Sequence, residues 1–183
     1  GGVGMDNIDV EYAKSKGIHV INTPASSSAS VAELVFAHLY GGVRFLYSSN
    51  RNMPLEGESN FKGLKKNFSK GMELRGKTLG IIGFGRIGQE VAKIGLGVGM
   101  NIIASDKFMD EANVKVSFAS GESIDINIKT QSFDHLIENS DFITLHVPAQ
   151  KAYVIDAGVF SKMKKGAGII TSSFGLISKA INA

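Results

Sequence analysis

Three glycines and one aspartate have the types and the spacing that suit the binding of a nucleotide. Gly83, Gly85 and Gly88 follow the pattern Gly-x-Gly-x-x-Gly, and Asp106 stands about 20 residues further on. An apolar run over 78–82 leads into the glycines, and apolar residues at helical spacing follow them. The amino end of a helix carries free N–H groups and a partial positive charge, which attract a diphosphate.

Each glycine has a distinct predicted role in that turn. Gly83 would form the tight turn, Gly85 would leave room for the phosphates, and Gly88 would let the helix pack against the strand. Arg86 and Ile87 would then stand at the start of the helix, beside the phosphates. This arrangement predicts a diphosphate site at the end of the first strand.

Asp106 ends the next apolar segment, where a carboxylate can accept hydrogen bonds from the hydroxyls of an adenosine ribose. The same charge would repel a 2′-phosphate, so the sequence favours NAD over NADP, although the neighbouring Lys107 could weaken that preference. Two alternatives remain open. The glycines could merely pack a helix on a strand while Asp106 caps a turn, or the turn could belong to an S-adenosylmethionine methyltransferase, which shares both features.

The elements around these residues alternate between strand and helix, which predicts an α/β fold. The expected order is a strand at 78–82, a helix from 86, a strand at 101–105, a hairpin over 114–128, a helix at 132–140, a strand at 142–148, a helix near 160–164 and a strand from 166. We therefore expect a Rossmann-type, doubly wound parallel sheet with an inserted β-hairpin.

The segment before this domain predicts two helices, a short strand and a loop. Residues 9–24 predict a short helix stopped at Gly17 and a short strand ended at Pro24. The segment 31–47 is apolar nearly all round, with Ser30 and Glu33 at capping-box spacing, and predicts a helix covered by other protein. Residues 48–76 contain Pro54 and several glycines, which indicate a loop or arm.

Composition narrows the possible functions. The chain has 183 residues, no cysteine and a net charge of +3, so it predicts one main globular domain without disulfides or cysteine-bound zinc, in the cytoplasm. No secretory signal and no membrane span are visible in it. Lysines cluster over 61–77 with interleaved phenylalanines, and we interpret this run as a solvated arm rather than a nucleic-acid site.

Several motifs together resemble the D-isomer-specific 2-hydroxyacid dehydrogenases over nearly the whole chain. The segments that carry the resemblance are GGVGMDNID, GIHVINTP, SASVAELVFAHL, ELRGKTLGIIGFGRIG and SDFITLHVP. Within the family, the chain is most similar to members that act on 3-phosphoglycerate in serine biosynthesis. The resemblance implies a remnant of a substrate domain at 1–25, and a linker helix with an NAD-binding domain, cut short at its C-terminal end, at 26–183.

The resemblance also implies cofactor contacts, a reaction and partners. It places Val3, Arg86, Ile87, Asp106 and Val147 at NAD-contacting positions, followed by Pro148 in the same motif. The family transfers a hydride reversibly between NAD and a 2-hydroxy or 2-oxo acid. The resemblance therefore also implies a homodimer that is joined through its coenzyme domains.

The resemblance stops near the C-terminus. The family has an Asn-x-x-Arg-Gly motif after its fifth strand, whereas this chain has Phe174 at the arginine position before Gly175. Lys179 replaces the acid expected four residues later, and the segments that carry the family's glutamate and histidine would lie beyond Ala183. Phenylalanine cannot donate a hydrogen bond to an oxyanion. We therefore expect NAD binding without turnover, and a non-catalytic NAD-binding or dimerising module remains the alternative.

The four histidines are interpreted as structural. His146 is expected at a strand end, where it would help to wall the cofactor pocket, because the family's acid–base histidine belongs to a later segment. His38 is expected in the core or an interface, and His19 and His135 at the surface. No set of histidines or carboxylates has convincing spacing for a metal.

Overall fold

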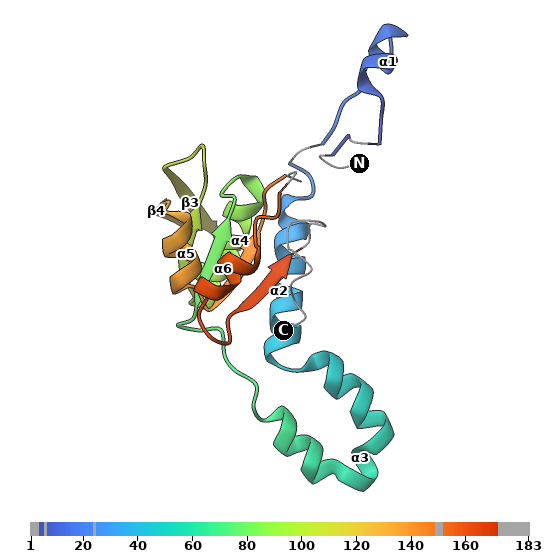
Figure 1. The fold of residues 1–183 in the computed structure, drawn as a ribbon, viewed down its shortest axis with the longest axis vertical. Helices are drawn as coiled ribbons and strands as arrows, with labels where there is room; N and C mark the ends of the chain where they lie inside the picture. The colour runs from blue at the N-terminus through green and yellow to red at the C-terminus, as the bar shows by residue number, and fades with distance from the viewer. Residues whose placement is uncertain (1–3, 6, 24, 149–151, 172–183) are drawn as a thin grey trace.

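The computed structural model describes residues 4–5, 7–23, 25–148 and 152–171, and Figure 1 shows their arrangement. The helices are α1 (Val10–Ser15), α2 (Ser28–Val43), α3 (Leu46–Phe68), α4 (Arg86–Val98), α5 (Phe133–Asn139) and α6 (Ala157–Lys162). The strands are β1 (Thr78–Ile82), β2 (Asn101–Ser105), β3 (Glu111–Ser117), β4 (Ser123–Lys129), β5 (Phe142–Leu145) and β6 (Gly168–Thr171). The predicted alternation of strands and helices from residue 78 onward is confirmed.

Four of the strands form a parallel sheet in the order β2-β1-β5-β6. β1 pairs with β2 from Thr78 opposite Asn101, and with β5 from Leu79 opposite Phe142. After β1 the chain thus forms β2 on one side of β1, and it later forms β5 on the other side of β1. The carboxyl ends of β1 and β5 flank this change of direction, which is where open parallel sheets bind their ligands.

Helices cover both faces of the sheet, as the doubly wound fold requires. On one face Leu79 and Ile81 of β1 pack with α2, α4 and the β3–β4 hairpin, and on the other Ile143 and Leu145 of β5 pack with α5 and α6. Both strands alternate their side chains between the two faces, and all four of these side chains are fully buried. The sheet is therefore the rigid centre of the domain.

The inserted hairpin is confirmed as the antiparallel pair β3–β4, with Val114 opposite Ile126. β4 pairs only with β3, so the hairpin forms a sheet of its own. A single parallel bridge, between Ala104 of β2 and Thr130, connects the end of the hairpin to the sheet. The hairpin lies instead against α4, where Val114 is buried.

The N-terminal segment differs from the sequence-based expectation. The short helix is present as α1, and the backbone at Gly17 has the positive φ of 71° typical of a helix end. Residues 18–23 form no strand, and Pro24, where the strand was expected to end, lies outside the described residues. A strand needs a partner for its backbone groups, and α1 with its following segment extends away from the sheet (Figure 1).

The linker helix begins earlier than predicted. α2 starts at Ser28, after Ser27, which makes no side-chain capping bond, so Ser30 and Glu33 lie inside the helix and the predicted capping box is wrong. One face of α2 is buried against α4 and the sheet, while Leu34 and Tyr40 remain 46% and 41% exposed on the rest of its surface. The expectation that other protein covers this surface stays a prediction.

The region expected to be a loop or arm is mostly helical. α3 runs for 23 residues to Phe68, with Pro54 inside it and a kink at Asn60, whose φ is −134°. Pro54 and the glycines suggested a loop, but Pro54 lies inside the first of two helical stretches, which meet at Asn60. Leu64 is the buried residue of α3, so the helix forms an arm that projects from the domain (Figure 1).

Candidate functional site

The glycine turn follows β1 directly and has a conformation that only glycine adopts easily. Gly83 has a φ of 89°, and a Cβ atom placed on it would lie 2.6 Å from the carbonyl oxygen of His146. The amide of Gly83 donates to the carbonyl of Ser105, and the amide of His146 donates to the carbonyl of Ile82. The turn is therefore fixed between the carboxyl ends of β2 and β5, as the first glycine of the motif requires.

The other two glycines differ in what surrounds them. A Cβ on Gly88 would collide with the carbonyl oxygen of Gly83, so Gly88 allows α4 to pack closely against the turn. A Cβ on Gly85 would meet nothing within 4 Å. Gly85 is the N-cap of α4 and uses no side chain to satisfy the free amides of the first turn. This leaves an open approach to the amino end of α4, which fits a diphosphate.

Asp106 follows β2 and is held by two backbone amides. Its Oδ2 accepts from the amide of Phe84 at 2.7 Å, and its Oδ1 accepts from the amide of Phe108 at 2.8 Å. The bond to Phe84 ties the carboxylate to the glycine turn. Lys107 is exposed beside it. The acid predicted to bind a ribose is thus fixed within reach of the turn predicted to bind the phosphates.

A cavity of about 720 Å³ opens at the carboxyl ends of β1, β2 and β5. It is lined by Ile82, Gly83, Gly85, Ser105, Asp106, Lys107, Phe108, Gln131, Ser132, Phe133, His146, Val147, Pro148 and Val154. Five residues named from the sequence, Gly83, Gly85, Asp106, Val147 and Pro148, are brought together in it. Arg86 and Ile87 begin α4 next to this lining, whereas Gly88 is buried behind the turn. Val3 lies outside the described residues.

The lining also contains residues that the sequence analysis did not identify. Phe108 follows Asp106 by two positions, and Gln131, Ser132 and Phe133 come from the segment between the hairpin and α5. Only a weak sequence signal pointed to Gln131, Ser132 and Phe133. These residues and Thr130 come shortly after the last apolar residue of a predicted strand, and ligands often bind at strand ends. Without knowledge of the bridge from Thr130 to Ala104, nothing placed that segment beside β2.

His146 belongs to the wall of this cavity, at the end of β5. Its Nε2 lies 3.0 Å from the hydroxyl oxygen of Thr144, which is fully buried. Burial lowers the pKa of His146 to about 4 from its ordinary value of 6.5. The imidazole is therefore neutral at physiological pH and adds no positive charge to the cavity.

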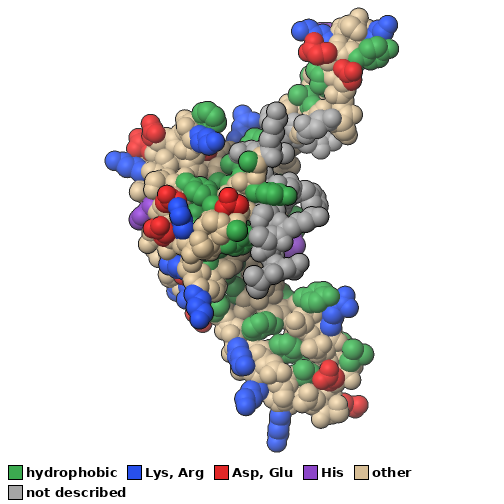
Figure 2. Space-filling model, viewed as in Figure 1, with side chains coloured by type: hydrophobic (Ala, Val, Ile, Leu, Met, Phe, Trp, Pro, Cys, Tyr) green, Lys and Arg blue, Asp and Glu red, His purple; other side chains and the backbone are tan. Residues whose placement is uncertain are grey.

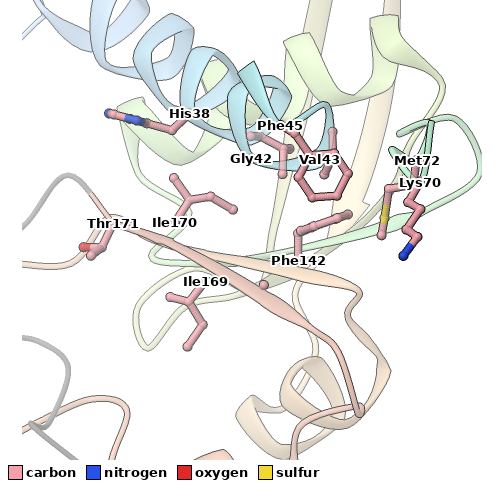
Figure 3. A pocket seen from close by; sticks show the side chains of 12 residues that line it. His38, Gly42, Val43, Phe45, Lys70, Met72, Phe142, Ile169, Ile170 and Thr171 are labelled. Carbon is pink, nitrogen blue, oxygen red and sulfur yellow. The ribbon is translucent and has the colours of Figure 1, made fainter. Parts of the chain in front are cut away.

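A second cavity of about 550 Å³ lies between α2, the segment before β1 and the edge strand β6 (Figure 3). Val43 and Phe142 line it with mostly apolar surface, and His38 and Lys70 are its ionisable groups. His38 was expected in the core or an interface. Its side chain is exposed, so it is not in the core, and its place in an interface stays a prediction. His19 and His135 are exposed, as predicted.

The comparison with known families decides the identity of the domain. The family described as the D-isomer specific 2-hydroxyacid dehydrogenase, NAD binding domain, matches residues 36–179. The chain belongs to this family. It contains the NAD-binding domain of a D-2-hydroxyacid dehydrogenase.

Individual relatives agree with this assignment. The chain is 42% identical to the hydroxypyruvate reductase of Thermotoga maritima over 176 residues, which cover 95% of the chain and 52% of that protein. It is 38% identical to the D-3-phosphoglycerate dehydrogenase of Archaeoglobus fulgidus, again over 95% of the chain but 31% of the relative. The chain thus spans about half of the length of the first relative and about a third of the second.

A solved structure shows the same fold with its cofactor. The NAD⁺-bound 3-phosphoglycerate dehydrogenase of Entamoeba histolytica superposes with a TM-score of 0.63 and 30% identity, over 93% of this chain and 46% of that one. NAD is the cofactor that the description of this chain's own family names, and the open approach at Gly85 and the carboxylate of Asp106 fit it.

The described residues contain neither a metal-binding cluster nor a helix that could span a membrane. No group of three or more histidines, aspartates or glutamates among them is arranged to hold a metal ion. None of the helices in that part of the chain combines the length and the apolar character needed to cross a membrane.

Proposed function

We propose that the chain binds NAD in the 720 Å³ cavity and serves as the coenzyme half of a D-2-hydroxyacid dehydrogenase. One observation carries the proposal: the open amino end of α4 at Gly85 and the fixed carboxylate of Asp106 line the same cavity. A dinucleotide needs both features, because its diphosphate is bound by helix amides and its ribose by an acid.

The proposal assigns a role to each predicted contact residue. The amides of Arg86 and Ile87 bind the diphosphate, Gly83 and Gly85 allow its close approach, and Gly88 holds α4 against the turn. Val147 and Pro148 contact the cofactor from the segment after β5, and Val3 is a further NAD-contacting position.

Asp106 gives NAD preference over NADP in this proposal. Its carboxylate is fixed by the amides of Phe84 and Phe108, so it cannot easily turn away from a 2′-phosphate. The repulsion between the two negative charges would then act against NADP, with Lys107 as the nearby opposing charge.

The substrate class that we propose is a 2-hydroxy acid and the corresponding 2-oxo acid, with 3-phosphoglycerate as the first candidate. The relatives named above include both a D-3-phosphoglycerate dehydrogenase and a hydroxypyruvate reductase. Hydroxypyruvate is therefore the second compound to test.

We propose that the chain of residues 1–183 binds NAD without turning over. Phe174 stands where the family has the arginine that polarises the substrate oxygen, and neither it, Gly175 nor Lys179 lies within the described residues. Loss of one such donor typically costs on the order of 10²–10³ in rate. A non-catalytic NAD-binding or dimerising module is the second candidate, and Phe174 is the observation that favours it.

Calorimetric titration of the chain with NAD and NADH, followed by assays with 3-phosphoglycerate and hydroxypyruvate, tests these proposals. Binding of NAD without turnover would support them. Measurable turnover would contradict the role given to Phe174, and failure to bind NAD would contradict the assignment of the cavity. Preferential binding of S-adenosylmethionine would favour a methyltransferase instead.

We also propose that the chain is a cytoplasmic homodimer, with residues 1–25 as a remnant of the substrate domain and 26–183 as the linker helix and coenzyme domain. α3 is the observation that supports association, because it exposes large apolar side chains while little of it packs on the domain. Figure 2 shows several of these side chains, in green, on the projecting arm. Leu46, Tyr47, Leu55 and Phe61 are between 53% and 82% exposed.

A further inference from the structure

Both backbone groups of Phe84, in the middle of the glycine turn, are bonded to side chains from outside the turn. Its amide donates to Asp106, and its carbonyl oxygen accepts from Nε2 of Gln89 at 3.1 Å. Gln89 belongs to α4, and its Nε2 also lies 3.7 Å from the sulfur of Met109 in the loop after β2. The ring of Phe84 is fully buried. Two side chains thus fix the peptide groups on either side of Phe84.

The backbone of α4 does not hold the carbonyl of Phe84. The amide of Gln89 donates to the carbonyl of Gly85, one residue further along the chain. Within the described residues, Nε2 of Gln89 is the donor that the carbonyl of Phe84 has. A side chain without a donor at position 89 would therefore leave the peptide group between Phe84 and Gly85 without the bond that fixes its orientation.

The bond from Gln89 also determines the direction of the Gly85 amide. In a trans peptide group the C=O and N–H bonds point in opposite directions, and the described part of the chain has no cis peptide. Because the carbonyl of Phe84 points to Gln89, the N–H of Gly85 points away from Gln89. No group in the described residues accepts from this N–H. Gly85 lines the cavity, whereas Gln89 and Met109 do not.

We propose that Gln89 is a positioning residue for the cofactor, because it holds the amide of Gly85 toward the diphosphate. This inference rests on the proposed binding of NAD in the cavity. An N–H that already points to its ligand donates without reorganisation, and a hydrogen bond to an anionic phosphate is stronger than one between neutral groups. The amides of Arg86 and Ile87 thereby gain a third donor beside them. Gln89 itself does not touch the cofactor.

The first test compares Gln89→Met with the unmodified chain of residues 1–183. Methionine is similar in length to glutamine and suits a helix, but it donates no hydrogen bond. Calorimetry measures the affinities for NAD and ADP-ribose, and an NMR titration measures the affinity for adenosine, which has no phosphate. Gln89→Met should weaken NAD and ADP-ribose about 3-fold to 10-fold, the usual effect of one hydrogen bond, and leave adenosine unchanged.

Met109→Leu is the matched control. It removes the contact between Gln89 and the sulfur and leaves the bond from Gln89 to Phe84 in place. Leucine is a conservative replacement for a methionine that packs against the core. Met109→Leu should therefore change none of the three affinities. A loss of NAD affinity in Met109→Leu as large as that in Gln89→Met would contradict the role given to the bond with Phe84.

A spectroscopic test reports on the Gly85 amide itself. In the unmodified chain, ADP-ribose should shift the NMR resonance of this amide proton downfield, as expected when an N–H donates to a phosphate, and adenosine should not. In Gln89→Met the downfield shift should be smaller. Damage to the turn as a whole would weaken adenosine together with NAD, so the two ligands distinguish a positioning role from a structural one.

Three results in a chain that binds NAD would overturn the positioning role alone. They are full affinity of Gln89→Met for NAD, a loss of adenosine affinity equal to the loss for NAD, and a Gly85 resonance that does not respond to bound ADP-ribose. Failure of the unmodified chain to bind NAD would overturn the proposed function together with it.

Discussion

The carboxylate of Asp106 accepts a hydrogen bond from the backbone amide of Phe84, with 2.7 Å between Oδ2 and the nitrogen. This bond joins the end of β2 to the glycine turn after β1. A carboxylate that is fixed in this way needs no rearrangement when a dinucleotide binds, so its contribution to affinity is not reduced by ordering of the side chain.

Asp106→Asn should change cofactor preference more than it changes the fold. The amide oxygen of asparagine can still accept from Phe84, whereas its NH2 group cannot accept from the amide of Phe108. The charge that binds the ribose and repels a 2′-phosphate is lost. NAD should bind about 10-fold to 100-fold more weakly, because a hydrogen bond to a charged group contributes roughly 1.5–3 kcal/mol. NADP should bind more tightly than to the unmodified chain, and calorimetry with both cofactors measures the two changes.

Lys107 provides the control for that experiment. In the Asp106→Asn background, Lys107→Ala should remove part of the gain in NADP affinity, because it removes the exposed positive charge beside residue 106. An unchanged ratio of NAD to NADP affinity in Asp106→Asn would show that Asp106 does not face the ribose.

Substitutions at two glycines of the same turn should have different effects, one mainly on the stability of the domain and the other mainly on its affinity for NAD. Gly83→Ala forces a Cβ to within 2.6 Å of the His146 carbonyl at a φ of 89°, and should destabilise the domain by about 2–4 kcal/mol. Gly85→Val places its side chain in open space and should cost less than about 1 kcal/mol, yet it should weaken NAD binding on the order of 10²-fold.

Urea denaturation and calorimetry on both glycine variants provide the measurements. Two results would contradict the argument: a Gly83→Ala domain as stable as the unmodified one, or a Gly85→Val domain that keeps full affinity for NAD. The second result would show that the diphosphate does not approach the amino end of α4 at Gly85.

The sequence predicted those parts of the structure whose signals are local. The turn at Gly83, the strands beside it and the β3–β4 hairpin each follow from a short pattern of glycines or alternating apolar residues, and the sheet then follows from their order. These patterns also named Gly85 and Asp106, because a strand end and a helix start are visible within a few residues of each.

The features that the sequence did not predict depend on contacts between distant segments. α3 was expected as a loop because Pro54 and its glycines suggest one, although the helix continues through a kink at Asn60. A strand was expected before Pro24 because nothing local shows that it lacks a partner. Phe108 was missed as a lining residue of the cavity for the same reason, since the position of its loop depends on the hydrogen bonds from Thr130.

The exposed apolar surface of α3 leads to a prediction about assembly. If a second copy of the chain covers this surface, Leu55→Asp should dissociate the dimer, because Leu55 is 82% exposed on the arm and a buried carboxylate without a partner is unfavourable. Light scattering should show the mass falling from twice to once the chain mass of 19.5 kDa.

Ile124→Asp is the control for assembly, because Ile124 is 55% exposed on the hairpin rather than on α3. It should leave the mass unchanged. A monomeric unmodified chain, or a dimer that survives Leu55→Asp, would rule out this surface as the interface.

His146 should make the stability of the domain depend on pH. Burial lowers the pKa of His146 to about 4, whereas the unfolded chain titrates near the ordinary value of 6.5. Between these values the unfolded state binds a proton that the folded state does not, so the free energy of unfolding should fall as the pH drops from 6.5 to 4. At about 1.4 kcal/mol for each pKa unit, the loss amounts to at most about 3.5 kcal/mol.

His146→Gln removes this titration and retains a polar partner for the hydroxyl of Thr144. Urea denaturation at pH 7.5 and pH 4.5 should therefore show a smaller loss of stability in His146→Gln than in the unmodified chain. His135→Gln, at an exposed position, should lose as much stability as the unmodified chain. Equal losses in His146→Gln and the unmodified chain would mean that the imidazole is protonated as easily in the folded state as in the unfolded one.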